Sequence, residues 1–135
     1  MSFMAQATSA YRQAATAVSP TIALVRLYDE TILQIRKAIA AIQIKRFDDA
    51  FTHVSKATAI LRGLRGGLDF ERGGAIAVTL SSMYSKNILA LHTAFGTKDQ
   101  IVRYHKIVDG LAHLRDAWID VAKSMSQAAV VGNTG

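Results

Sequence analysis

The sequence predicts an all-α fold, an antiparallel up-down four-helix bundle with a short N-terminal segment, helical or extended, that docks on it. Four segments repeat apolar residues at alternating steps of three and four, the spacing that lines one face of an α-helix. The connections between them are short, which places consecutive helices antiparallel. A chain of 135 residues is large enough for one self-sufficient core. We therefore predict a single domain over 1–135, with an N-terminal cap segment at 1–18, the bundle at 19–129 and a frayed tail at 130–135.

The first helix is predicted over 20–45. Ser19 is a typical N-cap, and Pro20 at the first helical position gives up an N–H that has no partner there. Its apolar seam consists of Val25, Tyr28, Ile32, Ile35, Ile39 and Ile42. A second stripe beside it consists of Leu24, Leu27, Thr31, Ala38 and Ala41. A face this wide indicates two neighbours, the second being a partner's helix or the N-terminal segment.

The second helix is predicted to begin at Asp48 or Asp49, because acidic residues suit the positive end of a helix. Gly66 and Gly67 are candidates for its end, although the seam continues to Leu68. The seam consists of Ala50, Val54, Ala57, Leu61, Leu64 and Leu68.

After a short connection at 69–73, the third helix is predicted from Gly74 to a glycine cap at Gly96. Asn87 at a seam position either specifies register or is a local imperfection. The seam consists of Ile76, Leu80, Met83 and Asn87, with Ile88, Leu91 and Phe95 beside it.

Thr97 and Gln100 have the spacing of a capping box, which starts the fourth helix and takes it to about Ala129. Its seam consists of Ile107, Leu111, Leu114, Trp118, Val121 and Met125. Residues 4–17 are alanine-rich and too short to form a stable helix alone, with Tyr11 as their one large side chain after Met4. This segment either docks on the bundle or stays mobile.

Composition excludes several classes of protein. The absence of cysteine excludes disulfides, iron–sulfur clusters and thiolate catalysis, and it suits a reducing compartment. The first residues do not form a secretory signal, and the uncharged stretches at 13–25 and 73–85 are too short for a bilayer. We expect a soluble, cytoplasmic protein without membrane insertion.

The formal net charge of +6 and the isoelectric point near 9.9 favour an acidic partner. The cations are scattered over several helices, so nucleic acid is a weak interpretation. They include Arg26, Arg36, Lys37, Lys56, Arg62, Arg65, Arg103, Lys106 and Arg115.

Catalytic patterns are scarce. The histidines at 53, 92, 105 and 113 form no HExxH pair, and the glycines lack the lysine and the spacing of a phosphate-binding loop. Asp109, His113, Asp116 and Asp120 share one side of the fourth helix at a spacing that superficially suits a metal. Because the other helices supply no inward carboxylates, a solvated acidic face is the favoured interpretation. We predict no enzyme activity, no cofactor and no metal site.

Three aromatic residues lie in or beside the seams: Tyr28, Tyr84 and Trp118. We favour a core role for them, in which each polar tip finds a partner, over direct contact with a ligand.

An ordered set of residues from Tyr11 to Trp118 resembles the flagellar secretion chaperone family FliS. The set consists of Tyr11, Ser19-Pro20, Leu27-Tyr28-Asp29, Lys56-Ala57, Ile60-Leu61, Leu64, Leu68-Asp69, Gly73-Gly74-Ala75-Ile76-Ala77, Leu80, Met83-Tyr84 and Leu114-Arg115-Asp116-Ala117-Trp118. The resemblance implies an antiparallel helical bundle, in agreement with the seams. It also implies that the N-terminal segment covers part of a groove when the partner is absent.

The function implied is a cytoplasmic export chaperone that binds the disordered C-terminal segment of flagellin. Such a chaperone prevents premature polymerisation and keeps flagellin competent for flagellar type III secretion, and the complex meets the export gate. The expected contacts, in the groove and through the N-terminal cap, are Tyr11, Leu24, Leu27, Tyr28, Ile76, Leu80, Tyr84 and Trp118. The alternative is a non-catalytic helical adaptor or homodimeric bundle that docks another amphipathic helix.

Overall fold

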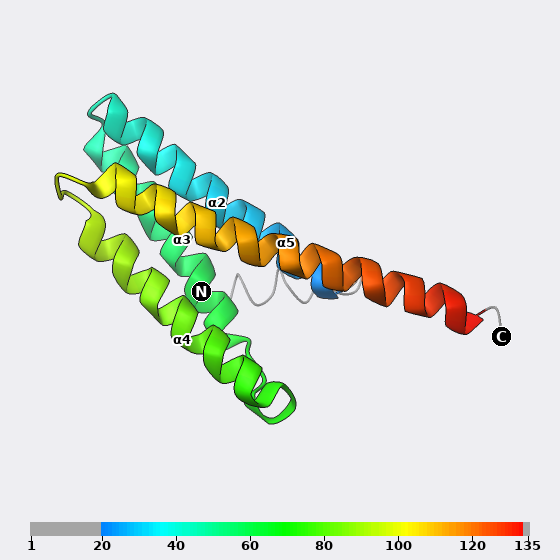
Figure 1. The fold of residues 1–135 in the computed structure, drawn as a ribbon. Coiled ribbons are helices and arrows are strands. Elements are labelled where there is room, and N and C mark those ends of the chain that lie inside the picture. Colours follow the sequence, from blue (N-terminus) through cyan, green and yellow to red (C-terminus); the bar gives the residue numbers. More distant parts are fainter. Residues whose placement is uncertain (1–19, 134–135) are drawn as a thin grey trace.

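The computed structural model describes residues 20–133, with side chains through residue 124. Every element in this part of the chain is an α-helix, and the helices pack on one another as a four-helix bundle, which confirms the predicted fold class (Figure 1). The helices are α2 (Pro20–Gln43), α3 (Phe47–Gly66), α4 (Phe70–Ala94) and α5 (Gln100–Asn133). The predicted N-terminal cap segment, with Tyr11 and the Ser19 cap, lies outside the described residues.

Turns at 44–46, 67–69 and 95–99 reverse the chain, so consecutive helices run antiparallel (Figure 1). α2 has the largest interfaces, with α3 and α5, whereas α4 and α5 share the smallest one. Because the helices alternate in direction, the α2–α3 and α4–α5 loops lie at one end of the bundle, and the α3–α4 turn lies at the other (Figure 1).

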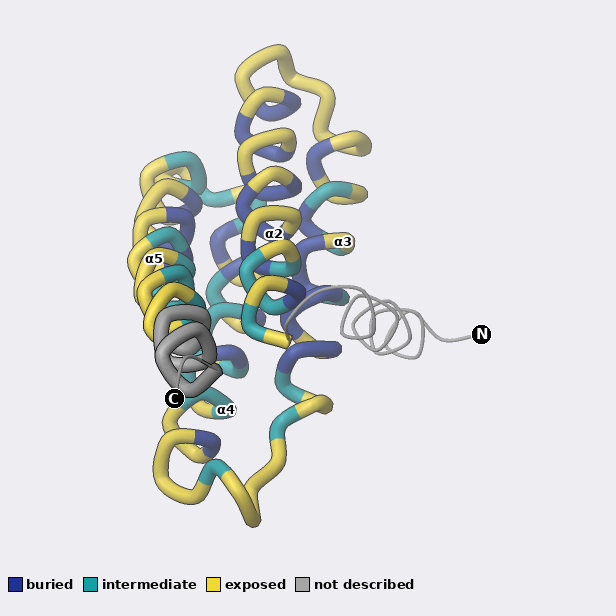
Figure 2. The backbone as a smooth tube through the Cα atoms, turned by 90° about the vertical axis from the view of Figure 1, so that its right-hand side faces the viewer, coloured by how far each residue is buried: buried dark blue, intermediate teal, exposed yellow. Residues whose placement is uncertain are grey.

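Most predicted seam residues of α2 and α3 are buried in the core, which residues of α4 and α5 complete, whereas Val25 and Leu68 are half-buried. Buried positions recur along one side of each helix, and the outward side is exposed (Figure 2). Sequence analysis did not single out Tyr104, which is fully buried and donates a hydrogen bond from its hydroxyl to the carbonyl of Leu91 at 3.2 Å. The largest apolar residues that are fully buried are Tyr28, Tyr84, Tyr104, Ile32, Ile35, Leu61, Leu91, Leu111 and Val54.

α2 ends two residues before the predicted position. The turn that follows it donates hydrogen bonds to two of the last carbonyl groups of the helix. Lys45 has a positive φ of 61°. Its N–H donates to the Ile42 carbonyl at 3.0 Å, and the Arg46 N–H donates to the Ala41 carbonyl at 2.8 Å. This hydrogen-bond pair is the Schellman motif, with lysine where glycine is usual. α3 follows directly at Phe47, so the prediction of Asp48 or Asp49 was wrong by one or two residues.

α4 begins four residues before the predicted start. Asp69 caps its N-terminus, because its Oδ1 accepts the N–H groups of Glu71 and Arg72 at 3.1 Å each. The predicted connection at 69–73 is thus a capped helical turn. The break comes at Gly74, whose φ of 50° and ψ of −125° interrupt the helix, so the glycine marks a kink rather than a helix start.

The seam of α4 lies about one residue from the predicted one. Ile76, predicted in the core, is 68% exposed, while Ala77 is buried. Ile76 comes one residue before Ala77, the first buried residue of this face, and it lines the pocket instead of the core. Asn87, Leu80 and Met83 lie half-buried at the side. The buried positions are Ala77, Tyr84, Ile88, Leu91 and Ala94.

The predicted capping box at α5 does not form. Thr97 donates its hydroxyl to the Ala94 carbonyl at 2.6 Å, closing the end of α4 instead. Gln100 Oε1 accepts the N–H of Gly96 at 2.9 Å, and Gly96 has the positive φ of 82° expected of a terminating glycine. The side chains of Thr97 and Gln100 both make capping hydrogen bonds, but each bonds to a backbone group other than the one that a capping box predicts.

α5 continues to Asn133, beyond the predicted end near Ala129, and it projects past the other helices (Figure 1). Val121 was predicted in the seam but is 41% exposed, because it follows Trp118, the last described hydrophobic residue of α5 that packs against the core. The side chain of Met125 lies outside the described part.

Candidate functional site

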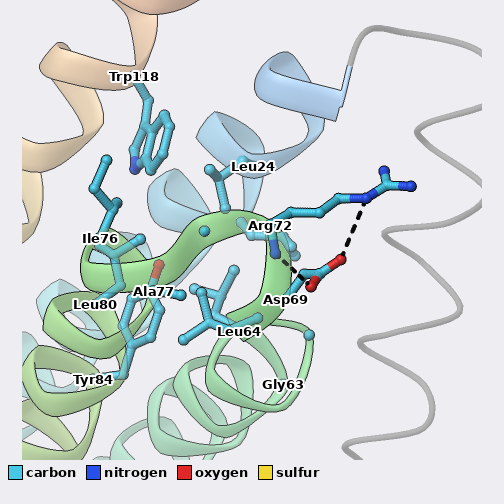
Figure 3. Close-up of a pocket in the computed structure, with 14 residues that line it drawn as sticks. Leu24, Gly63, Leu64, Asp69, Arg72, Ile76, Ala77, Leu80, Tyr84 and Trp118 are labelled. Carbon is cyan, nitrogen blue, oxygen red and sulfur yellow. Dashed lines mark hydrogen bonds and ion pairs between the residues drawn. The ribbon is translucent and has the colours of Figure 1, made fainter.

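A pocket of about 350 Å³ opens at the end of the bundle where α3 turns into α4. Side chains from all four helices surround it, with Trp118 of α5 opposite Leu64 of α3 and with Leu24 of α2 between them (Figure 3). The lining residues are Leu24, Leu27, Gly63, Leu64, Gly67, Leu68, Asp69, Arg72, Gly73, Ile76, Ala77, Leu80, Tyr84 and Trp118.

The fold brings together six of the eight residues predicted to contact a partner. These six line the pocket: Leu24, Leu27, Ile76, Leu80, Tyr84 and Trp118. A seventh, Tyr28, is fully buried behind the wall, where its hydroxyl is hydrogen-bonded to that of Tyr84. The eighth, Tyr11, lies outside the described residues. Whether the six contact a partner remains a prediction.

The corner between α3 and α4 is part of the site that was not predicted from the sequence. Gly63, Gly67 and Gly73 line the pocket with backbone where other residues would fill it. A Cβ added to Gly73 would lie 2.8 Å from the Cβ of Ala77, so this position has no room for a side chain. The clustering of glycines around Leu68 was the signal, because it marks places where backbone approaches closely.

The two tyrosines form the rigid back of the pocket. Their ring centroids are 6.3 Å apart at an interplanar angle of 42°. Burial raises the pKa of Tyr28 and, more strongly, that of Tyr84, so both hydroxyls are neutral at physiological pH. The predicted core role is correct for this pair, because each polar tip satisfies the other.

Trp118 differs from the tyrosines. It is half-buried, and its indole Nε1 is closed to solvent and makes no hydrogen bond of ordinary geometry with a described residue. The indole nevertheless interacts with the Tyr28 hydroxyl, where it acts to lower the pKa of that group.

The rim of the pocket is polar and charged. Asp69 Oδ2 and Arg72 Nε form an ion pair at 3.7 Å, and 57% and 92% of these two side chains are exposed. Arg72 extends away from the pocket (Figure 3). An ion pair this exposed contributes little to stability. Apolar walls with a sparse charged rim favour the binding of apolar side chains from a partner over the catalysis of a reaction.

The predicted metal alternative on α5 gains no support. In the part of the chain that the structure describes, no three His, Asp or Glu side chains lie close enough to hold a metal ion. Asp109, His113, Asp116 and Asp120 are exposed along α5, and among the described residues they form no group that could hold a metal ion. No helix within residues 20–133 is long and apolar enough to cross a membrane.

Comparison with known proteins decides the family. The profile of the family described as "Flagellar protein FliS" matches residues 4–125, most of the chain. The chain belongs to the FliS family. The family resemblance predicted from the ordered residues is thereby confirmed.

A curated FliS-family relative is also similar along most of its length. It is the "Flagellar secretion chaperone FliS" of Campylobacter jejuni subsp. jejuni serotype O:6 (strain 81116 / NCTC 11828). The two are 28% identical over 116 residues, which cover 85% of this chain and 90% of the relative. The FliS family and the relative's name support the role of a flagellar secretion chaperone, and a chaperone family suggests a non-enzymatic role.

Proposed function

We propose that this FliS-family protein is a cytoplasmic export chaperone that binds the C-terminal segment of flagellin. It prevents premature polymerisation and keeps flagellin competent for flagellar type III secretion, and the complex is what the export gate receives. The observation that carries the proposal is the apolar pocket of about 350 Å³ between Leu24, Leu64, Leu80 and Trp118.

The chemistry of the pocket suits a segment that is disordered when free. Such a segment pays an ordering cost when it folds on its partner, and buried apolar area must offset that cost. A helix would place anchors at i, i+3 or i+4 into the pocket while its polar face stays in water. The partly buried Leu24, Leu27 and Leu80 present apolar surface for these anchors.

The pocket has a firm back and an adaptable mouth. Tyr28 and Tyr84 fix the back through their mutual hydrogen bond. Ile76 is 68% exposed at the mouth, where it gains most from being covered. A partner that covers Ile76 therefore removes apolar surface from water without rearranging the core.

The proposal is tested by calorimetry with full-length monomeric flagellin and with flagellin truncated at its C-terminus. We expect heat at about one-to-one stoichiometry with the first and none with the second. A matched pair of surface variants locates the site: Ile76→Glu lies in the pocket, and Leu89→Glu lies on the same helix outside it, at 68% and 64% exposure. Ile76→Glu should weaken binding about tenfold or more because it places a charge against an apolar partner, and Leu89→Glu should leave it within about twofold.

Equal binding of the truncated flagellin contradicts the role of the C-terminal segment. Equal effects of the two glutamate variants contradict the pocket. If flagellin fails to bind while another amphipathic helix or a second copy of the chain does, the adaptor or homodimer alternative takes its place.

The N-terminal segment is proposed as a competing cap over the same pocket, with Tyr11 packed near Leu24, Leu27 or Tyr28. Deleting residues 1–17 then exposes apolar surface, lowers solubility and changes the affinity for flagellin. Tyr11→Ala should do part of the same, since burying an aromatic side chain contributes about 1.5–3 kcal/mol. Hydrogen exchange that leaves the amides around Tyr11 unprotected with and without flagellin, together with unchanged affinity on deletion, would refute the cap and leave the chaperone proposal intact.

A further inference from the structure

The net positive charge of the chain is concentrated in one half of the bundle. Two interhelix contacts mark the level of the division: the hydrogen bond of Tyr28 with Tyr84, and the ion pair of Asp29 with Arg115 at 3.0 Å. On the side of the α2–α3 and α4–α5 loops, residues 31–56 and 86–113 contain nine Lys and Arg and four carboxylates. The remaining described residues contain six of each. The cations that look scattered in the sequence are therefore brought to one end by the fold.

Most of these cations lack a local counter-charge. Arg46 pairs with Asp49 at 2.7 Å and Arg103 pairs with Asp99 at 3.1 Å. The other seven form no ion pair with a described residue, and all of them are exposed. Lys37 and Lys56 lie close enough to His53 to lower its pKa, so charges from α2 and α3 add up on one face. The positive field at this end is uncompensated within the described part of the molecule.

The same end exposes large apolar side chains. Ile44, Phe47 and Phe51 are 68%, 51% and 53% exposed. Phe51 also contacts Phe95 edge-to-face, with ring centroids 5.6 Å apart, which joins the start of α3 to the end of α4. Lys45 and Lys98 lie in the two loops beside these residues. We call Ile44, Lys45, Phe47, Phe51, Phe95 and Lys98 the end surface.

The end surface is separate from the pocket. Leu24 lines the pocket and Ile44 follows the last residue of α2, so the two sites are about 30 Å apart at 1.5 Å per helical residue. One partner helix of ordinary length does not span both. The two sites can therefore be occupied together.

Charge decides what fits there. A second copy of the chain would bring like charge against like charge if it used the same end. The chain's own residues 1–19 contain Arg12 and no carboxylate, so they do not complement the surface either. A phosphate backbone has no apolar side chains to cover the exposed Ile44, Phe47 and Phe51. The complement is a protein segment with apolar anchors and carboxylates on its flanks.

We propose that the end surface docks an acidic amphipathic helix of another protein, at the same time as the pocket is occupied. Apolar anchors of that helix cover Ile44, Phe47 and Phe51, and its carboxylates face Lys45 and Lys98. Because this proposal rests on a different end of the bundle, it does not depend on flagellin binding.

The test is a titration of the intact protein, followed by amide chemical shifts and by calorimetry. The probe is a synthetic amphipathic helix of about five turns, with leucine on one face and glutamate on its flanks. We expect shifts at residues 44–51 and 95–102, with or without flagellin present. Lys45→Glu with Lys98→Glu should weaken binding about tenfold, and so should Phe51→Ser, which replaces a half-exposed side chain. Arg26→Glu with Arg62→Glu changes the net charge equally in the other half and should stay within about twofold.

Four results overturn the proposal. The first is equal weakening by both pairs of charge reversals, because it shows a response to total charge alone. The second is equal or tighter binding of a peptide in which every glutamate is replaced by lysine. The third is tighter binding of single-stranded oligothymidylate at the same residues, which makes the end surface a nucleic-acid site. Absence of any shift with the glutamate peptide also refutes it.

Discussion

At the scale of single residues, the hydrogen bond between Tyr28 and Tyr84 joins the core to the pocket. Both side chains are almost fully buried, so each hydroxyl depends on the other. Tyr84→Phe should destabilise the fold by about 1–3 kcal/mol because it leaves the Tyr28 hydroxyl without a partner. The double variant Tyr28→Phe/Tyr84→Phe should cost less than the two single changes added together. Urea unfolding of the parent, the two single variants and the double variant completes a double-mutant cycle. Strict additivity of the two changes in unfolding free energy would argue against a coupled pair.

Lys45 is a second residue whose conformation has a measurable cost. It has a φ of 61°, in the left-handed region that favours glycine, at the end of α2. Lys45→Gly should stabilise the protein by about 0.5–1 kcal/mol, because relief of strain exceeds the added entropy of the unfolded chain. Thermal unfolding monitored by circular dichroism checks the direction. A lower melting temperature for the glycine variant would mean that the lysine side chain contributes more than its backbone costs.

His53 makes stability depend on pH. Its Nδ1 lies 2.8 Å from Gln34 Oε1, and burial together with Lys56 and Lys37 holds its pKa below the usual 6.5. Because the unfolded chain takes up this proton more readily, the stability contributed by neutral His53 is present above pH 6.5 and is lost as the pH falls towards the lower folded-state pKa. Urea unfolding at about pH 7.5 and about pH 5.5 measures how much the free energy of unfolding falls on acidification. This fall should be smaller for His53→Gln than for the parent protein. His105→Gln, at an exposed position on α5, is the control that should keep the parent's loss.

At the scale of elements, the same substitution to alanine should have opposite effects on stability at two glycines. Neither Gly74 nor Gly110 has any atom within 4 Å of an added Cβ, so the contrast is one of backbone alone. Gly74 has φ 50° and ψ −125°, and Gly74→Ala should cost about 1–3 kcal/mol. Gly110 lies inside α5, and Gly110→Ala should stabilise by about 0.5–1 kcal/mol. Chemical denaturation measures both, and loss of stability in both would indicate that the kink is not the cause.

The elements also show how far the sequence is informative. Helical periodicity predicted all four helices, because spacing of three and four is a local property of the chain. Periodicity does not show where the buried face of α4 begins: Ile76 was placed in the core, but it is exposed, and the buried face begins at Ala77. Of the six predicted contact residues that line the pocket, five belong to the ordered family pattern and Leu24 belongs to the second stripe of the first helix, whereas Gly63, Gly67 and Gly73 were missed because they contribute by having no side chain.

At the scale of the whole molecule, charge governs association. The cations gather at one end only after the chain folds, so their arrangement was beyond sequence analysis. With a net charge of +6, association with an acidic flagellin should slow as salt rises from about 50 to about 500 mM, because screening shortens the reach of the field. Dissociation should change less. Stopped-flow mixing measures both rates, and an association rate independent of ionic strength would rule out electrostatic steering.

The position of Trp118 has a practical consequence for all of these experiments. The chain contains one tryptophan, and it lies in the wall of the pocket, half-buried beside Leu80 and Tyr84. Indole emission responds to the polarity around the ring, so filling the pocket with apolar side chains should shift the emission to shorter wavelength. The end surface contains phenylalanine and no tryptophan, and docking there should leave the emission unchanged. The protein thus contains an intrinsic fluorophore that distinguishes occupancy of one site from the other without a label.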